Sequence, residues 1–418
     1  MISTSAADSS KKGSALEFDA ARQIVIETTR SLLAGDLSGR REAVPIFEAH
    51  GRILAEPLLA DRDIPAVRRS LRDGFAVRSS DLPGALVILG EVRAGDLGSE
   101  TAPTGTATEI MTGAPVPGGS DAVVMIEHVA VFQDQRGRKM VKIDSPAEAG
   151  QFINNRGAEA VKGVTLIPSG TRLDASHVAA LASAGKSEVQ VFRRPSVAIL
   201  ATGDEIVEVA DQPLPHQIRN SNSYMLASLV RAAGGVPTVL PIARDRAEDL
   251  QPLLERGLTH DLLVVTGGVS AGKYDLVKPG LRHLGVEFIF ERVRIQPGQP
   301  TAFGRRGGTP VFGLPGNPGS TLITFELFAR PVLELLGGLA EPILPLLSAS
   351  FEAPFRHKGG LTRFLPASLA PDGQHLRHIS WQGSSDIPAL ARANAFLVAD
   401  HDRLTWEIGD TIRVMLKP

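Results

Sequence analysis

The sequence predicts a multidomain α/β protein built around a doubly wound, mostly parallel sheet. Its 418 residues are too many for one ordinary core and suit about three units of ~150 residues. Strand-like and helix-like segments alternate regularly over 195–338, which is typical of a parallel sheet covered on both faces. On either side of this region, short β-type runs are broken by glycine and proline, which favours β-rich domains there.

These changes of pattern predict four domains. We expect a discontinuous helical and extended domain in 15–60 plus 145–194, in which the two pieces pack together. A β-rich lobe is expected in 61–144, the doubly wound domain in 195–338 and a small all-β domain in 339–418.

The segments 15–60, 61–144 and 145–194 are predicted to contain few regular elements. Apolar spacing predicts a helix over 18–33, stopped by Gly35, and a second helix over 175–184, stopped by Gly185. A strand at 188–192 follows the second helix. The strands expected in the lobe are 85–89, 122–126 and 140–143.

The central domain is the most regular part of the chain. We expect its strands at 197–201, 236–242, 262–265, 288–293 and 310–313, and its helices at 222–233, 247–258, 275–284 and 320–336. The all-β tail should contain strands at 363–366, 378–381, 395–398 and 411–415.

Composition limits the class of function. Hydrophobic residues make up 43%, charged residues 22%, and the formal net charge is −2, which gives no overall attraction to nucleic acid or anionic membrane. The absence of cysteine excludes disulfides, iron–sulfur clusters and cysteine nucleophiles. No apolar run approaches the ~18 residues of a membrane span. We expect a soluble cytoplasmic protein with no nucleic-acid or membrane partner.

Three glycine-containing loops follow predicted strands of the central domain, at 201–205, 266–275 and 314–320. Ligands bind at the carboxyl ends of strands in open parallel sheets, and glycine lets backbone amides approach an anion closely. The second loop therefore resembles a phosphate cradle, with Ser270 and Lys273 as further donors. Each loop alone could equally be a simple turn.

Carboxylates gather at the same strand ends. Asp204, Glu205, Asp245 and Asp275 would lie beside the cradle, and Mg²⁺ prefers one or two carboxylates together with substrate oxygens. Helix N-capping is the alternative role for Asp245 and Asp275. The sequence has no His-x-x-x-His pair, no Gly-x-Ser-x-Gly elbow, no P-loop lysine motif and no dinucleotide fingerprint, so zinc hydrolases and nicotinamide dehydrogenases are not favoured.

Several motifs in register resemble the molybdopterin molybdenumtransferase family over almost the whole chain. They are Ser-Leu-Arg-Asp-Gly-Phe-Ala-Val at 70–77, Ile-Met-Thr-Gly-Ala-Pro-Val-Pro at 110–117, Asp-Ala-Val-Val at 121–124, Arg-Gly-Ala-Glu at 156–159, Thr-Gly-Asp-Glu at 202–205, Arg-Asn-Ser-Asn at 219–222, Gly-Gly-Val-Ser at 267–270 with Asp275, Pro-Gly-Gln-Pro at 297–300 and Pro-Gly-Asn-Pro at 315–318.

The resemblance implies an elongated homodimer of four-domain chains, each ending in a β-barrel. It implies a transferase that inserts molybdenum from molybdate into adenylylated molybdopterin with Mg²⁺ and releases AMP. A molybdopterin adenylyltransferase is the implied protein partner.

The resemblance also implies the roles of individual residues. The functional acids and their polar contributor fall on Asp73, Thr112, Glu159, Glu205, Asp245 and Asp275, with Asp245 and Asp275 as metal ligands. Residues implied to bind or shape the ligand site are Gly267, Gly268, Ser270, Lys273, Arg292, Pro300, Pro315, Pro318, Ser320, Arg363, Ser384 and Ser385. The Asp73 and Thr112 loops are expected to reach the cleft of the dimer partner.

Departures from the family pattern leave alternatives open. Gln296 and Gln299 stand where the family usually has lysines, and Gly319 stands where it usually has valine. A catalytically weakened molybdopterin-binding paralogue and a tungstate-inserting homologue therefore remain alternatives. A nucleotide pyrophosphatase or deamidase is a further alternative, although such an enzyme would need only the central ~150 residues.

Overall fold

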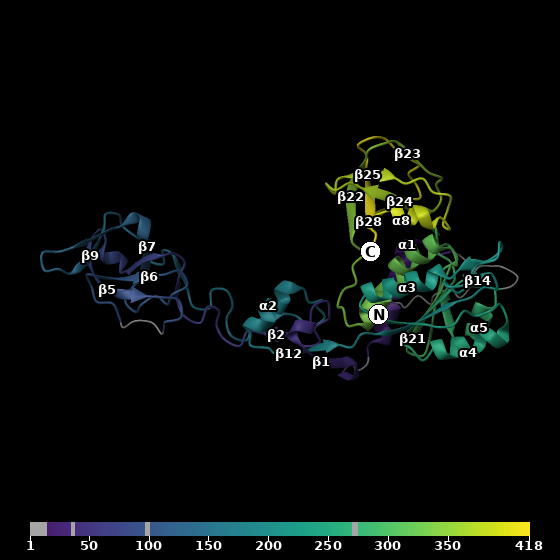
Figure 1. Cartoon of the computed structure of the whole chain (residues 1–418), viewed down its shortest axis with the longest axis horizontal. Helices are drawn as coiled ribbons and strands as arrows, with labels where there is room; N and C mark the ends of the chain where they lie inside the picture. Colours follow the sequence, from purple (N-terminus) through teal and green to yellow (C-terminus); the bar gives the residue numbers. More distant parts are fainter. Residues whose placement is uncertain (1–14, 35–37, 97–100, 270–274) are drawn as a thin grey trace, which may run out of the picture.

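A computed structural model describes residues 15–34, 38–96, 101–269 and 275–418. The molecule is elongated (Figure 1). A β-rich lobe lies at one end of the longest axis, and the central sheet and the C-terminal β domain lie together at the other end.

The central sheet has six strands in the order β16-β13-β17-β21-β20-β18. The first four are parallel, and β20 and β18 form an antiparallel edge, so the predicted mostly parallel sheet is confirmed. Their bounds are β16 Val236–Val239, β13 Ser196–Ala201, β17 Leu262–Thr266, β21 Thr309–Leu314, β20 Ala302–Arg306 and β18 Glu287–Phe290. Strand β20 was not predicted, because Gly304 and two arginines interrupt its apolar pattern.

Helices cover both faces of this sheet. Val197 and Ile199 of β13 belong to one hydrophobic cluster, and the alternating Ala198 and Leu200 belong to another. A strand buried on both faces reads as a continuous apolar run, which is why the sequence revealed it. The helices are α3 Ser221–Ala232, α4 Ala247–Gly257, α5 Val277–His283, α6 Pro318–Thr324 and α7 Arg330–Leu336, with the π-helical turn Phe325–Ala329 joining the last two.

Helix α1 (Phe18–Leu32) corrects one expectation. Its apolar face carries Phe18, Ala21 and Val25, and this face packs into the cluster of α3, α6 and α7 rather than with the segment 145–194. Phe18 meets Phe328 edge to face, at 6.2 Å between ring centroids. The first helix is therefore part of the central core, because that is where aromatic partners for its apolar face lie.

A small connecting unit is built from two distant pieces of chain. β1 (Arg41–Pro45) pairs with β12 (Glu188–Phe192), and β2 (Leu58–Leu59) pairs with β11 (Thr165–Ile167). Helix α2 (Ala175–Ser183) packs on this unit through Leu181. The unit links the lobe to the central domain (Figure 1).

The lobe contains a six-stranded sheet in the order β7-β4-β6-β5-β9-β8. The bounds are β7 Ala122–Met125, β4 Gly74–Val77, β6 Thr106–Ile110, β5 Gly84–Val92, β9 Lys139–Ile143 and β8 Ala130–Gln133. Two short strands, β3 (Arg69–Ser70) and β10 (Ile153–Asn154), pair where the lobe meets the connecting unit.

The C-terminal domain is a closed five-stranded barrel, as the family resemblance implied. Strands β24-β25-β22-β28-β26 follow one another, and β26 pairs back onto β24. They span β22 Leu346–Phe351, β24 Thr362–Leu369, β25 His375–His378, β26 Ala395–Ala399 and β28 Thr411–Leu416. The strand predicted at 378–381 is wrong, because β25 ends at His378 and Trp381 instead packs between the barrel core and the central core.

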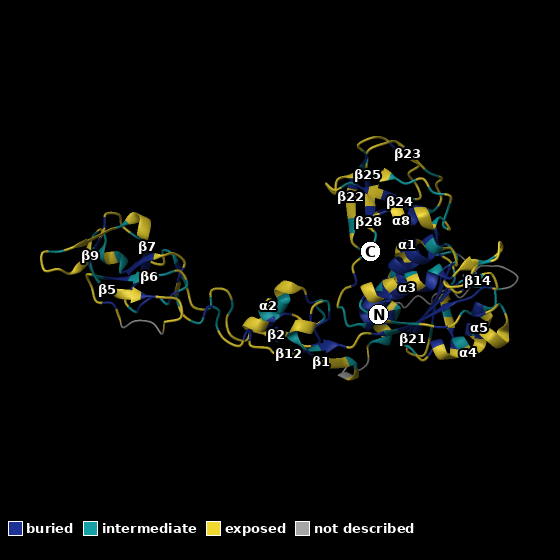
Figure 2. Ribbon diagram, in the orientation of Figure 1, coloured by how far each residue is buried: buried dark blue, intermediate teal, exposed yellow. Residues whose placement is uncertain are grey.

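Further short elements complete the barrel. Helix α8 (Ile387–Arg392) and the pair β23 (Phe355–Arg356) with β27 (Thr405–Trp406) are additions to the prediction. Strand β19 (Ile295–Gln296) leaves the central domain and pairs with β24. Figure 2 shows buried residues concentrated in the central sheet and its helices. Within the described residues, no helix is long and apolar enough to cross a membrane.

Candidate active site

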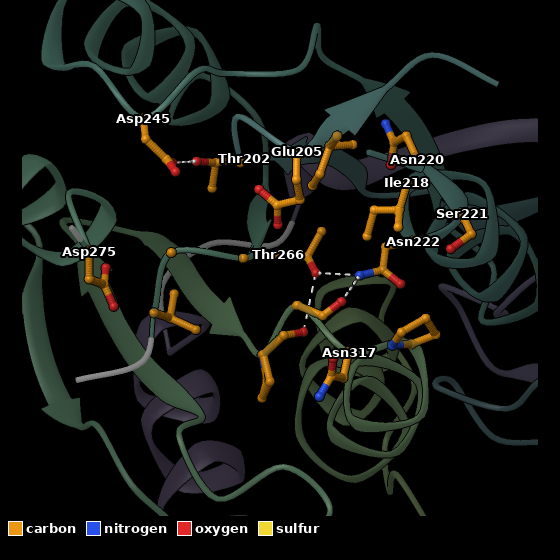
Figure 3. Close-up of a pocket in the computed structure, with 18 of the residues that line it drawn as sticks. Thr202, Glu205, Ile218, Asn220, Ser221, Asn222, Asp245, Thr266, Asp275 and Asn317 are labelled. Carbon is orange, nitrogen blue, oxygen red and sulfur yellow. Dashed lines mark hydrogen bonds between the residues drawn. The ribbon is translucent and has the colours of Figure 1, made fainter. Parts of the chain in front are cut away.

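A cleft of about 470 Å³ opens at the carboxyl edge of the four parallel strands. It lies where β13 and β17 are neighbours although β16 comes between them in sequence, which is the usual ligand position in doubly wound sheets. Figure 3 shows the side chains around it. Its lining residues are Thr202, Gly203, Glu205, Ile206, Ile218, Arg219, Asn220, Ser221, Asn222, Asp245, Thr266, Gly267, Gly268, Val269, Asp275, Pro300, Pro315, Gly316, Asn317 and Pro318.

Glycine is required where the first two loops meet. A Cβ on Gly267 would lie 2.4 Å from the carbonyl oxygen of Thr202, and Gly267 has φ +91°. A Cβ on Gly203 would lie 2.5 Å from Oε2 of Glu205. Larger residues would therefore push the ends of β13 and β17 apart or displace an acid of the cleft.

A buried polar network fixes the cleft floor. Nδ2 of Asn222 donates to Oγ1 of Thr266 at 3.0 Å and to the carbonyl of Gly316 at 2.6 Å. Oγ1 of Thr321 donates to the carbonyl of Pro315 at 2.6 Å. The network joins the start of α3, the end of β17 and the loop before α6, so three distant segments are held in one arrangement.

The adjacent acids Asp204 and Glu205 have different surroundings. Glu205 lines the cleft, whereas Asp204 accepts a hydrogen bond from the backbone amide of Asp245 at 3.2 Å. Oδ1 of Asp245 accepts a hydrogen bond from Oγ1 of Thr202 at 3.0 Å. Asp204 therefore holds the Asp245 loop, while Glu205 and Asp245 both border the cavity.

Asp275 is the most perturbed acid of the cleft. Its two carboxylate oxygens are buried and have no hydrogen-bond partner among the described residues. Burial raises the pKa of Asp275 to about 6, although the charge of Lys278 and two backbone amides at the start of α5 oppose this shift. The nearby charge of Asp245 raises the pKa further.

The N-cap residue of α4 is Arg246 and that of α5 is Leu276, and neither of these side chains makes a cap bond. Asp245 therefore does not take the N-cap position of α4. Capping stays an alternative for Asp275, because the backbone amides of Val277 and Lys278 in the first turn of α5 act on its carboxylate. No group of three or more histidine or acidic side chains comes within reach of one metal ion in the part of the chain that the structure describes.

Three predicted residues lie away from this cleft. Asp73 and Thr112 are exposed residues of the lobe. The lobe and the central sheet lie at opposite ends of the longest axis of the molecule (Figure 1). Oδ1 of Asp73 accepts hydrogen bonds from the amide of Thr112 at 2.6 Å and from its hydroxyl at 2.7 Å. Glu159 is exposed and accepts a hydrogen bond from Nδ2 of Asn154, a residue of β10, at 2.9 Å.

The remaining predicted ligand residues divide into two groups. Gly267, Gly268, Pro300, Pro315 and Pro318 line the cleft. Arg292, Ser320, Arg363, Ser384 and Ser385 do not, and Ser320 is buried in the first turn of α6. Ser270 and Lys273 lie outside the described residues.

Three of these ligand residues, Arg363, Ser384 and Ser385, belong to the barrel domain. Arg363 pairs in register with Gln296, and its Nε donates to the carbonyl of Lys358 at 2.8 Å. Ser384 accepts a hydrogen bond from Nδ2 of Asn317 at 3.0 Å. A loop of the barrel therefore contacts the rim of the cleft directly.

Sequence reasoning missed several cleft residues. Asn222 and Thr266 fix the floor, and Ile218, Asn220 and Asn317 border the cavity. The motif at 219–222 precedes a predicted helix of the same domain, and this position could have placed these residues at the same sheet edge.

Three protein families match consecutive parts of the chain. The family described as MoeA N-terminal region (domain I and II) matches residues 16–185. The probable molybdopterin binding domain matches 198–335, and MoeA C-terminal region (domain IV) matches 348–417. Together they cover most of the chain in the order of the family.

Curated relatives and solved structures agree with this match. The chain is 38% identical to a molybdopterin molybdenumtransferase of Nostoc sp. over 90% of this chain and 89% of the relative. It is 32% identical to the Bacillus subtilis protein of that name over 94% and 93% of the two chains. A molybdopterin biosynthesis MoeA protein from Pyrococcus horikoshii superposes with a TM-score of 0.79 at 27% identity, over 96% of this chain and all of that chain. The chain belongs to the molybdopterin molybdenumtransferase family.

Proposed function

We infer that this protein is a transferase that inserts molybdenum into molybdopterin during cofactor synthesis, that it acts on the adenylylated form, and that it releases AMP. One observation carries the inference. Glu205, Asp245 and Asp275 border one cleft with two glycine-rich turns at the switch point of the sheet. A phosphoanhydride needs charge neutralisation and positioning more than it needs a strong nucleophile, and this cleft offers both.

The donor set of the cleft fits Mg²⁺. Asp275 presents two buried carboxylate oxygens without described partners, and Asp245 lies near enough to raise its pKa. Two carboxylates suit a cation that completes its coordination with substrate phosphates and water. Asp245 and Asp275 would hold Mg²⁺, which would neutralise charge on the phosphates when bound.

The chain's own residues would position the substrate. The backbone amide of Gly268 would contact a phosphate oxygen, because this glycine lines the cleft and allows close approach. The amide of Gly267 already donates to the carbonyl of Leu314 at 3.2 Å. Thr202 would orient Asp245 through the hydrogen bond between them. Glu205 would accept a hydrogen bond from a water molecule and hold it in reach of the substrate.

The lobe residues would act across a homodimer. Asp73 and Thr112 lie far from the cleft of their own chain, so they would complete the cleft of a partner copy. A molybdopterin adenylyltransferase would supply the substrate, and the cytoplasm would be the compartment. These assignments extend the same proposal.

The test is a release assay with purified protein. Adenylylated molybdopterin, molybdate and Mg²⁺ are mixed with the protein, and free AMP is measured by chromatography. We expect AMP to appear only when protein, molybdate and Mg²⁺ are all present. Retention of the adenylylated pterin without AMP release would contradict the proposal and favour the binding-only paralogue, to which the Gln296 and Gln299 replacements point.

Parallel reactions with tungstate separate the remaining alternative. A molybdenum enzyme should release AMP faster with molybdate than with equimolar tungstate. The opposite order would assign the chain to tungsten insertion.

A further inference from the structure

Arg244 precedes the cleft acid Asp245 in the chain but is not part of the cleft lining. It is an exposed residue. Nη1 of Arg244 donates hydrogen bonds to the carbonyl oxygens of Asp204 and Ile206, each at 3.1 Å. These two residues flank Glu205, so the guanidinium holds the peptide groups on both sides of an acid that does line the cleft.

A second element holds the same stretch of backbone from the opposite side. The carbonyl of Glu205 accepts a hydrogen bond from the amide of Ile218 at 2.9 Å. This bond extends the parallel pair of β14 (Ile206–Val207) and β15 (Ile218–Arg219). Successive carbonyls along a strand alternate in direction, so the carbonyls on either side of Glu205 point away from β15 and toward Arg244. The backbone at Glu205 is therefore fixed between β15 and Arg244.

The Glu205 carboxylate lies close to this backbone. A Cβ on Gly203 would lie 2.5 Å from Oε2 of Glu205. A rotation of the peptide groups at Asp204 or Ile206 would therefore move the carboxylate itself. An exposed arginine usually has little effect on function, but this one controls the turn that carries an acid of the cleft.

The neighbouring acid Asp245 is held without the Arg244 side chain. Oγ1 of Thr202 donates to Oδ1 of Asp245 at 3.0 Å. The amide of Asp245 donates to Oδ1 of Asp204 at 3.2 Å. Loss of the guanidinium should thus disturb Glu205 and leave the proposed cation site in place.

We propose that Arg244 is a positioning residue for the transferase reaction. It fixes the two peptide groups that flank Glu205, and it thereby keeps the Glu205 carboxylate and the water molecule bound to it in reach of the substrate. Arg244 acts from outside the cleft and touches neither the substrate nor the cation. The proposal rests on the function inferred above, because it is there that Glu205 binds the water.

The first experiment measures AMP release by Arg244→Met, which keeps most of the length of the side chain and removes its donors. A displacement of about 1 Å near a reacting group can lower a rate about 10²-fold, so kcat should fall about 10- to 100-fold. KM for adenylylated molybdopterin should change less than about threefold, because Arg244 does not line the cleft. Arg244→Lys keeps a charged donor for the carbonyls and should be at least about threefold more active than Arg244→Met.

A double-mutant cycle tests whether Arg244 acts through Glu205. Arg244→Met is combined with Glu205→Gln, and kcat of the double variant is compared with that of Glu205→Gln alone. If Arg244 acts by holding the Glu205 carboxylate, the loss caused by Arg244→Met should shrink to less than about twofold in this background. A general role in the fold would produce the same loss in both backgrounds.

The matched control is Arg246→Met, which removes another arginine of the same loop. Arg246 is exposed and does not line the cleft, and its side chain makes no cap bond at the start of α4. This variant should retain the kcat and KM of the wild type. Thermal unfolding verifies the fold of each variant, and an electron paramagnetic resonance titration should find the same Mn²⁺ affinity in Arg244→Met as in the wild type.

An unchanged kcat in Arg244→Met, or equal losses in the two backgrounds of the cycle, would overturn the proposal while leaving the transferase function intact. A loss of Mn²⁺ affinity as large as the loss of kcat would also overturn it, because Arg244 would then act on the cation site. A wild-type protein that releases no AMP would refute the transferase function and this role of Arg244 together.

Discussion

Two aspartates at opposite ends of the molecule, Asp73 and Asp275, occupy very different environments. Asp73 accepts two hydrogen bonds from Thr112, which hold the pKa of its carboxyl below the usual range. Asp275 has no described partner, and burial raises its pKa to about 6. The comparison indicates that Asp73 is a fixed anion whose lone pairs are partly used, whereas Asp275 is an acid that gains from a bound cation.

The largest loss of activity is expected from the substitution Asp275→Asn. The substitution removes a charge from the proposed cation site, so AMP release should fall about 10²- to 10³-fold. The control Asp249→Asn removes an exposed acid from the first turn of α4, outside the cleft, and should retain activity. Near-normal AMP release by Asp275→Asn would contradict the view that Asp275, in contrast with Asp73, needs its charge to hold a cation.

A mixing experiment tests whether Asp73 serves the cleft of another chain. Asp73→Asn and Asp275→Asn should each be inactive alone. Co-expressed, they should recover about a quarter of wild-type activity, because half of the dimers would contain one intact composite site. Equal inactivity of the mixed and single-variant samples would place Asp73 in a role within its own chain or its own lobe.

The pKa of Asp275 predicts a pH dependence that Asp73 should not show. Protonation of Asp275 removes its charge, so Mg²⁺ affinity should fall about tenfold for each pH unit below about 6. Calorimetric titrations at a series of pH values measure this slope. A constant affinity between pH 7 and pH 5 would exclude Asp275 as the titrating ligand.

The same shift affects stability with a definite sign. The folded protein holds the proton of Asp275 more tightly than the unfolded chain does, so the penalty for its charge is absent at low pH and complete above about 6. Without metal, Asp275→Asn should therefore be more stable than the wild type at pH 7, and the difference in melting temperature should vanish near pH 4.

The smallest expected effect is on the free energy of unfolding, and it concerns the contact between the start of α6 and the barrel domain. The amide of Gly319 donates to the carbonyl of Ser384 at 2.7 Å, and a Cβ there would lie 3.0 Å from that oxygen and 3.2 Å from the Trp381 ring. Gly319→Val should crowd this barrel contact and lower the free energy of unfolding by about 1–3 kcal/mol. Chemical denaturation measures the loss.

Gly308→Val is the matched control, because a Cβ at Gly308 would meet no atom within 4 Å. An equal effect of the two substitutions would show that the barrel contact is not tight. The connecting unit lies between the lobe and the central sheet (Figure 1).

The sequence revealed the elements that are buried on both faces. Strands β13 and β17 read as uninterrupted apolar runs because helices cover both sides of the sheet. Strand β20 lies toward the edge and includes Gly304, whose Cβ would lie 2.6 Å from the carbonyl of Glu287, so close packing rather than apolar pattern selects its residues.

The site was predictable only in part. Asp245 and Asp275 follow from their positions after parallel strands, because strand ends meet at one edge. The different roles of Asp204 and Glu205 could not follow, since adjacent residues look alike until one of them bonds the Asp245 backbone. The Asn222 network joins three loops, so it depends on tertiary contacts that the local sequence does not contain.

The most direct test of the central claim measures where a divalent cation binds. Mn²⁺ replaces Mg²⁺ in an electron paramagnetic resonance titration at pH 7.5 with AMP present, using the wild type, Asp275→Asn and Asp73→Asn. We predict one tight site per chain that is lost in Asp275→Asn and kept in Asp73→Asn. Full retention of the tight site in Asp275→Asn would contradict the account.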